Sequence, residues 1–384
     1  MKTFLKKIYI LSITLIMTIS IMPISNFNCF AESEWDKTDP HCWEIIENGI
    51  SYTTNPTAKE QTVYAQNTEA TAKDVIIPES INGLPVTSVS IEDNDTIQTL
   101  KIPSSVNWIR ILNCPDMIEF DVDKNNETFC SVNGVIYDKN CRVLICYPPS
   151  KEDKTFRIPD SVESIGYAEY NRTVPFNSCK YLENVIFPES LKGICECAFT
   201  KCNFEYIEFP EGVSCGPYAF GDNKNLKEVV IPENFNGFSD NTFEGCDLLK
   251  TAVSLRKEPF KDQYSPVSSW DPWSLGLDCV AYIFMFETID HITIYVPDDT
   301  VENYEYALGD VEQYNFVPLS KKPKGEIGDV NSNGKIEVLD AVNLQRYLSN
   351  KRSSIGLELD INEDNIVDVF DLIALKRMMI DSNS

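Results

Sequence analysis

Short apolar runs that end in proline recur along the middle of the chain and set its pattern of hydrophobic and polar positions. They read VIIPES from Val75, LKIPSS from Leu100, FRIPDS from Phe156, VIFPES from Val185, IEFPEG from Ile207 and VVIPEN from Val229. Successive prolines lie 22 to 29 residues apart, except for one interval of 56 that spans two repeats. This period predicts a solenoid, because one repeat cannot bury its apolar face until neighbouring repeats stack on it.

A second signature lies between the prolines: an aromatic residue, then Cys or Asn three positions later, then Leu at six. It appears at Phe176–Cys179–Leu182, Phe220–Asn223–Leu226 and Phe243–Cys246–Leu249, and in part at Phe199–Cys202. In a stacked coil the Cys or Asn position points inward and bonds backbone groups at the turn. We therefore expect Cys179, Cys202 and Cys246 to be interior thiols rather than disulfide partners.

The proline-terminated strands occur together with corners of Ala or Thr followed by Phe. These corners are Ala198–Phe199, Ala219–Phe220 and Thr242–Phe243. The combination resembles the bacterial surface-antigen type of leucine-rich repeat, over about Gly49 to Lys250. The stretch from Phe120 to Ser150 looks like the hairpin insertion of that family, with Asn133 and Gly134 as its two-residue turn. The resemblance implies binding or adhesion and carries no catalytic residues.

Beyond Leu255 the repeat fades. From His291 the chain reads as a strand, a proline turn and a helix, which matches a closing repeat that shields the last apolar face. Pro318 to Glu326 then reads as a short flexible linker.

One twelve-residue pattern appears twice near the end of the chain, at an interval of 31 residues. The copies are DVNSNGKIEVLD, from Asp329 to Asp340, and DINEDNIVDVFD, from Asp360 to Asp371. Calcium takes about six to eight oxygen ligands, which a tight loop supplies from alternate side chains and one backbone carbonyl. The pattern predicts two Ca2+ ions held by Asp329, Asn331, Asn333, Lys335 (through its carbonyl), Glu337 and Asp340, and by Asp360, Asn362, Asp364, Ile366 (through its carbonyl), Asp368 and Asp371.

The sixth position of each loop must turn sharply. Gly334 suits that position in the first loop, and Asn365 in the second is the non-glycine residue that best tolerates a left-handed backbone. Ile336 and Val367, at position 8, are expected to pair the loops through an apolar contact. One amphipathic helix follows each loop, and Gly325 to Gly328 leave no room for a helix before the first.

Two loops, each with an exiting helix and with Asp at position 12, resemble the type I dockerin of cellulosome-forming bacteria, over about Ile327 to Ile380. The resemblance implies a two-helix calcium module that docks onto a cohesin domain of a scaffoldin. It places partner recognition at Val338, Leu339, Gln345, Arg346 and Asn350 in the first copy, and at Val369, Phe370, Lys376, Arg377 and Asp381 in the second. The apolar residues at positions 10 and 11 depart from the Ser-Thr pair of some cohesin specificities.

The chain begins with lysines and an apolar run from Ile8 to Met22, which predicts a secretory signal peptide cleaved after Ala31. No second apolar stretch could span a bilayer. Loss of Cys29 with the leader leaves twelve of the thirteen cysteines, and an even number outside the cell also permits disulfides. The net charge of −26 argues against nucleic acid or an anionic membrane as partner.

The sequence thus predicts an α+β chain, with a β-rich leucine-rich repeat solenoid followed by a small all-α dockerin with two helices and paired EF-hand-like loops. The expected parts are a signal peptide at 1–31, an N-terminal capping region at 32–74, the solenoid with its C-terminal cap at 75–317, a linker at 318–326 and the dockerin at 327–384.

The expected function is that of a secreted, non-catalytic cellulosome component in plant cell-wall degradation. The dockerin would bind a scaffoldin cohesin, and the solenoid would bind a glycan or protein. Only His41 and His291 are present, and the common hydrolase, zinc and phosphate motifs are missing. The alternative is a glycoside hydrolase or another cellulosomal enzyme of polysaccharide catabolism, because two carboxylates in an aromatic cleft suffice for glycoside hydrolysis.

Overall fold

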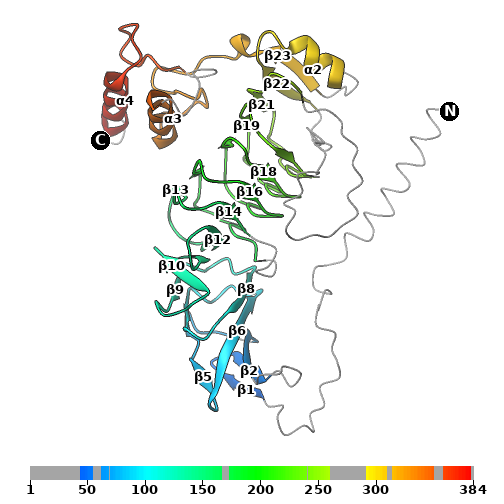
Figure 1. Cartoon of the computed structure of the whole chain (residues 1–384), viewed down its shortest axis with the longest axis vertical. Coiled ribbons are helices and arrows are strands. Elements are labelled where there is room, and N and C mark those ends of the chain that lie inside the picture. Colours follow the sequence, from blue (N-terminus) through cyan, green and yellow to red (C-terminus); the bar gives the residue numbers. More distant parts are fainter. Residues whose placement is uncertain are drawn as a thin grey trace, which may run out of the picture.

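The computed structural model describes residues 44–54, 62–68, 70–166, 173–239, 241–259, 291–308, 314–349 and 358–381. The predicted signal peptide and Asn350 lie outside these residues. The strands stack into one elongated coil from β1 at one end to β22 and β23 at the other, and helices α3 and α4 lie beside the later turns (Figure 1).

An antiparallel meander begins the described chain. Its strands are β1 (Glu44–Glu47), β2 (Ile50–Thr54) and β3 (Val63–Asn67). Strand β3 pairs in parallel with β6 (Leu84–Glu92), which also pairs with β5 (Ser80–Ile81) and with β8 (Trp108–Leu112). The meander and the first turns of the coil therefore form one continuous hydrogen-bonded sheet.

Each turn of the coil supplies strands to two sets of parallel pairs. The first set holds the proline-terminated strands and their equivalents: β4 (Asp74–Ile76), β7 (Thr99–Ile102), β9 (Glu119–Val122), β13 (Thr155–Arg157), β15 (Asn184–Ile186), β17 (Tyr206–Glu208), β19 (Glu228–Ile231), β21 (Thr251–Ser254), β22 (Ile292–Val296) and β23 (Tyr314–Pro318). The second set includes β12 (Val143–Cys146), β14 (Ser164–Ile165), β16 (Gly193–Ile194), β18 (Ser214–Cys215) and β20 (Gly237–Phe238). The predicted solenoid is confirmed.

The strands stack in register, so equivalent residues form columns. Ile207 faces Val229, and Val229 faces Ala252, inside the main core. Val230 and Val253 form the next column and point to the opposite side of the sheet. The sheet of β17, β19 and β21 is therefore apolar on both faces, as is usual for parallel strands covered on both sides.

The predicted hairpin insertion is also present. Strands β10 (Phe129–Val132) and β11 (Val135–Asp138) pair antiparallel around Asn133 and Gly134. The two turn residues have φ of 51° and 80°. Positive φ at both positions belongs to the turn whose twist matches that of paired strands.

The aromatic residues of the second signature form a continuous stack inside the coil. Phe176, Phe199, Phe220 and Phe243 lie in successive turns, with centroid separations of 4.5, 5.0 and 5.9 Å between neighbouring rings. All four side chains are buried, and burial of each contributes roughly 1.5–3 kcal/mol. The stacked rings thus make the apolar core continuous from one turn to the next.

The Cys or Asn of the same signature bonds the backbone of the preceding turn, as predicted. The Cys202 thiol donates to the Phe176 carbonyl at 2.8 Å, and the Asn223 amide donates to the Phe199 carbonyl at 2.8 Å. The Cys246 thiol donates to the Phe220 carbonyl at 3.2 Å. Burial raises the pKa of Cys246 to about 12, so the thiol keeps the proton that this bond requires. Cys179, Cys202 and Cys246 are free and buried.

The predicted closing repeat is present after β21. Strand β22 is followed by a turn at Pro297, helix α2 (Val301–Leu308) and strand β23. The buried Tyr304 hydroxyl of α2 lies 2.8 Å from the Ser254 hydroxyl. Helix α2 thereby covers the last turn.

The segment 318–326 differs from the expected flexible linker, because it is fixed to the solenoid. Pro318 ends β23, and Leu319–Lys321 form a 3-10 helix. The Lys322 ammonium lies 3.2 Å from the Glu228 carboxylate, and both side chains are largely buried. The aliphatic part of the lysine side chain covers apolar surface, and its ammonium group pairs with the carboxylate. The polar composition of the segment did not indicate this contact.

Candidate metal centre and docking surface

The last part of the chain forms a small two-helix unit. Helices α3 (Val338–Leu348) and α4 (Val369–Asp381) pack together. Their shared core contains Val330, Leu344, Leu359, Ile361 and Leu375. Ile336 and Val367, the expected apolar pair of the two loops, both pack against this core. The two copies of the loop pattern therefore fold as one unit.

The first loop turns its side-chain oxygens inward onto its own backbone. The Asp329 carboxylate accepts the Asn333 N–H at 2.9 Å and the Gly334 N–H at 2.8 Å. The Asn331 side-chain oxygen also accepts the Asn333 N–H, at 3.0 Å, and the Asn333 oxygen accepts the Lys335 N–H at 2.9 Å. Loop positions 1, 3 and 5 thus gather on one centre.

Asp340 closes the first loop and begins helix α3. Its carboxylate accepts the Glu337 N–H at 2.7 Å and the Asn331 N–H at 3.3 Å, and Glu337 and Asp340 form the capping box of the helix. The pKa of Asp340 is raised to about 7, chiefly by burial. The two N–H bonds lower the pKa, and the charges of Asp329 and Glu337 raise it. Like charges held together in a buried loop favour a bound cation.

The second loop repeats the same bonds. The Asp360 carboxylate accepts the Asp364 N–H at 3.2 Å and the Asn365 N–H at 2.9 Å. The Asp371 carboxylate accepts the Asn362 N–H at 3.1 Å and the Asp368 N–H at 2.7 Å, as Asp340 does at the same loop positions, and it also accepts the Ile361 N–H at 2.7 Å. The aspartates at positions 1 and 12 therefore make the same backbone contacts in both loops, with one added bond in the second.

The backbone follows the predicted sharp turn in both loops. Position 6 is left-handed in each, with φ of 87° at Gly334 and 68° at Asn365. Position 4 is left-handed as well, with φ of 57° at Ser332 and 59° at Glu363. Positions 4 and 6 have positive φ in both loops although different residue types occupy them. The geometry of the loop, and not the local sequence, therefore requires this backbone conformation.

The chemistry of the donors fits a hard cation. Within the part of the chain that the structure describes, no group of three or more His, Cys, Asp or Glu side chains forms a metal site by itself. The loops instead combine carboxylates with amide and backbone oxygens, which calcium accepts. The Asn331 amide nitrogen is buried without a hydrogen-bond partner; it is a donor and would not contact a cation, so the fit rests on the oxygen atoms.

Family comparisons match two parts of the chain. Residues 327–380 match the family described as "Dockerin type I domain". Residues 149–262 match the "BspA type Leucine rich repeat region" in 6 copies. The chain joins BspA-type leucine-rich repeats to a type I dockerin. Both resemblances seen in the sequence are confirmed. A type I dockerin supports docking onto a cohesin in a cellulosome-type assembly, and the repeats support a protein-binding role.

Solved structures with a similar arrangement are bacterial leucine-rich repeat proteins. One, from Eubacterium ventriosum, has 14% identity and a TM-score of 0.37, and the match covers 55% of this chain and 78% of that one. The pneumococcal vaccine antigen PcpA has 14% identity and a TM-score of 0.34, covering 72% and 98%. A leucine-rich cell surface protein from Faecalibacterium prausnitzii has 14% identity and a TM-score of 0.32, covering 62% and 97%.

No curated protein matches the chain. In the described ranges no helix combines the length and the apolar character needed to cross a membrane.

The dockerin residues predicted to bind a partner divide into two environments. In the first copy, Leu339 is 5% exposed and Arg346 is partly buried, while Val338 and Gln345 are exposed. All five residues of the second copy are exposed: Val369, Phe370, Lys376, Arg377 and Asp381.

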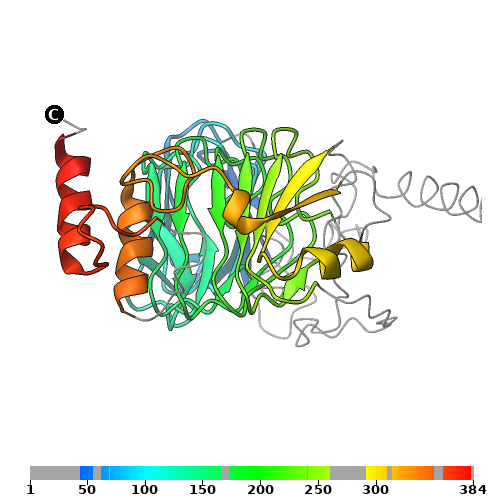
Figure 2. The same cartoon turned by 90° about the horizontal axis from the view of Figure 1, so that it is seen from above.

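One face of helix α3 is buried against the solenoid. Leu339 packs in one cluster with Ile186, Tyr206, Val230 and Val253, on the outward face of the proline-terminated strands. Figure 2 shows α3 between the coil and α4. A sequence feature that indicates this contact is the run of consecutive apolar residues in strands such as VVIP. Neighbouring residues of a strand point to opposite faces, so such a run predicts a strand that is covered on both faces.

Polar contacts surround that cluster. The Asn184 amide donates to the Glu337 carboxylate at 2.8 Å, and the Asn343 amide donates to the Glu208 carboxylate at 3.0 Å. The Arg346 guanidinium donates to the Phe187 carbonyl at 2.6 Å. Two of these pairs join residues more than 150 positions apart in the chain, so only the folded solenoid brings them together.

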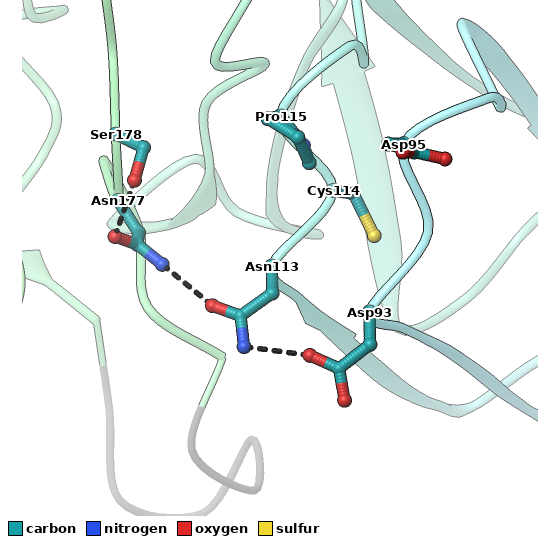
Figure 3. A pocket seen from close by; sticks show the side chains of 7 residues that line it. All are labelled: Asp93, Asp95, Asn113, Cys114, Pro115, Asn177 and Ser178. Atoms are coloured by element: carbon teal, nitrogen blue, oxygen red, sulfur yellow. Dashed lines mark hydrogen bonds between the residues drawn. The ribbon is translucent and has the colours of Figure 1, made fainter.

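A polar pocket lies on the coil, far along the chain from the dockerin. Figure 3 shows the Asn177 amide donating to Asn113 at 3.2 Å and the Asn113 amide donating to Asp93 at 2.8 Å. Cys114 and Asp95 also line it. Its polar groups bond to one another across turns, as groups that hold turns in register do.

Proposed function

We propose that this protein is a secreted, non-catalytic component of a cellulosome-type complex. Its dockerin, loaded with two calcium ions, would attach it to a scaffoldin cohesin, and its solenoid would bind a further protein or a cell-wall glycan during polysaccharide degradation. The observation that carries this proposal is the pair of loops with equivalent inward oxygens, left-handed turns and capping aspartates.

Calcium would act by stabilising the dockerin fold. The two ions would be held by the twelve ligand residues predicted from the sequence, six in the loop from Asp329 to Asp340 and six in the loop from Asp360 to Asp371. The unit is small, and small domains bury too little surface to be strongly stable alone. When free calcium exceeds the dissociation constant about 100-fold, each site adds about 2.7 kcal/mol to the stability of the folded state.

The direct test is a calcium titration of the full chain, followed by circular dichroism at 222 nm during thermal unfolding. The proposal expects the unfolding temperature of the helical signal to rise with calcium and to return on chelation. Magnesium at the same concentration serves as the control, since its octahedral preference suits these flexible loops poorly. A helical signal that is indifferent to calcium contradicts the proposal.

In this proposal the solenoid binds a ligand and does not catalyse a reaction. The family comparisons find repeats and a dockerin and no catalytic domain, which fits a binding protein. A glycan array and a reducing-sugar release assay on plant cell-wall polysaccharides separate the two functions. Release of sugar by the full chain would replace the binding role with a glycoside hydrolase.

A further inference from the structure

The two helices of the dockerin carry equivalent faces. The first face consists of Leu339, Val342, Asn343 and Arg346 on α3, and the second face consists of Phe370, Ile373, Ala374 and Arg377 on α4. Each residue of the second face follows its counterpart by 31 positions, which is the interval of the loop pattern. The spacing within each face places its four residues on one side of a helix.

The solenoid covers the first face. Leu339 and Val342 pack on the outward column of the sheet that contains Val230 and Val253. At the edge of this contact, the Arg346 guanidinium donates to the Phe187 carbonyl, just after β15, and the Asn343 amide donates to the Glu208 carboxylate. Arg346 is partly buried in this contact, and burial lowers its pKa. A second protein cannot contact these side chains while the solenoid does.

The second face is similar, with Ala374 in place of Asn343, and its Phe370, Ile373 and Arg377 are exposed. Phe370 is 62% exposed where its counterpart Leu339 is 5% exposed, and Ile373 is 39% exposed. Arg377 is exposed at the position equivalent to Arg346. Val369 adds a further apolar side chain that is 54% exposed. Exposed apolar residues gathered on one helix mark an interaction surface, and α4 lies on the side of α3 away from the coil (Figure 2).

We infer that the solenoid holds the first face of the dockerin, so that a cohesin docks on the second face alone. This inference rests on the proposed cohesin partner. The contact of the first face shows what its equivalent accepts: the flat side of a β-sheet, with an apolar centre and with a backbone carbonyl oxygen at the edge for the arginine. The same contact makes the solenoid a competitor for the first face within the chain.

The test measures cohesin binding by calorimetry with the full chain in calcium. The probe is the domain that binds the unaltered chain most tightly from a panel of type I cohesins. A second-face variant, Phe370→Ala with Arg377→Ala, is expected to bind about 100-fold more weakly, as for loss of two central interface residues. The matched first-face variant, Leu339→Ala with Arg346→Ala, is expected to bind within about threefold of the unaltered chain.

A rescue experiment separates competition from simple damage. Val230→Asp places a charge on the outer face of the solenoid strand and is expected to release α3. Added to the second-face variant, it should restore most of the lost affinity, because the freed first face can then bind. Ile373→Asp provides a second route to the same loss, and an unchanged calcium titration shows that the dockerin of each variant is folded.

The outcomes are distinct. Equal affinity of the second-face variant and the unaltered chain, or a large loss in the first-face variant, overturns the inference. Self-association of the chain that disappears with Phe370→Ala would make a second copy the occupant and would overturn it as well. If no cohesin binds the unaltered chain in calcium, the proposed function fails, and the inference fails with it.

Discussion

Replacement of Asp340 by Asn tests the role of the first calcium loop. The Asp340 carboxylate is fully buried and accepts two backbone N–H bonds. Its raised pKa means that burial makes the charged form costly in the absence of metal. Asparagine keeps the size and one acceptor oxygen but cannot supply the charge that a cation would use.

The expected effect depends on calcium. In chelator, the variant loses one hydrogen bond, worth about 1 kcal/mol, but is relieved of a buried charge, so its unfolding free energy should stay within about 1 kcal/mol of the unaltered chain. With free calcium about 100-fold above the dissociation constant, the unaltered chain gains about 2.7 kcal/mol from each site. The variant should gain that amount from the second site only.

Urea unfolding of the full chain, followed at 222 nm in chelator and in excess calcium, measures this difference. Helices α3 and α4 supply most of the helix in the described residues, so this signal follows the dockerin. Asp371→Asn is the matched change in the second loop and should lose the same increment. An Asp340→Asn variant that gains as much from calcium as the unaltered chain would refute the role of this carboxylate.

Further predictions concern the core and the first loop. Phe220→Ala should lower the unfolding free energy of the solenoid by about 3–5 kcal/mol in urea, because it interrupts the aromatic stack. Cys246→Asn should be tolerated, since Asn already fills the equivalent position at 223, whereas Cys246→Val should cost about 1–3 kcal/mol by leaving the Phe220 carbonyl without its donor. At pH 8 the Cys246 thiol, whose pKa burial raises to about 12, should resist alkylation until the chain unfolds. Gly325→Ala should weaken calcium binding in calorimetry, because an added Cβ would collide with the Asp329 carboxylate.

The repeats and loops could be predicted because their signals are local and recur. Each proline-terminated run carries its own strand, and each Phe and its Cys or Asn occupy the same place in successive turns. The left-handed backbone at Asn365 was predictable from the same logic, since the second loop copies the first.

The packing of the dockerin against the solenoid could not be predicted, because it depends on contacts between residues that are far apart in the sequence. Leu339 was expected to bind a partner protein, and in the structure its partner is the outer column of the solenoid. Lys322 read as part of a flexible linker because its residues are polar, yet it pairs with Glu228, nearly 100 positions earlier. Neither residue type nor spacing in the sequence specifies these pairs.

Cohesin binding to the full chain, measured by calorimetry in calcium and again in chelator, tests the central claim most directly. Calcium-dependent docking predicts clear binding in calcium and none in chelator, with the β-sheet signal of the solenoid unchanged. Equal affinity in both conditions would contradict it.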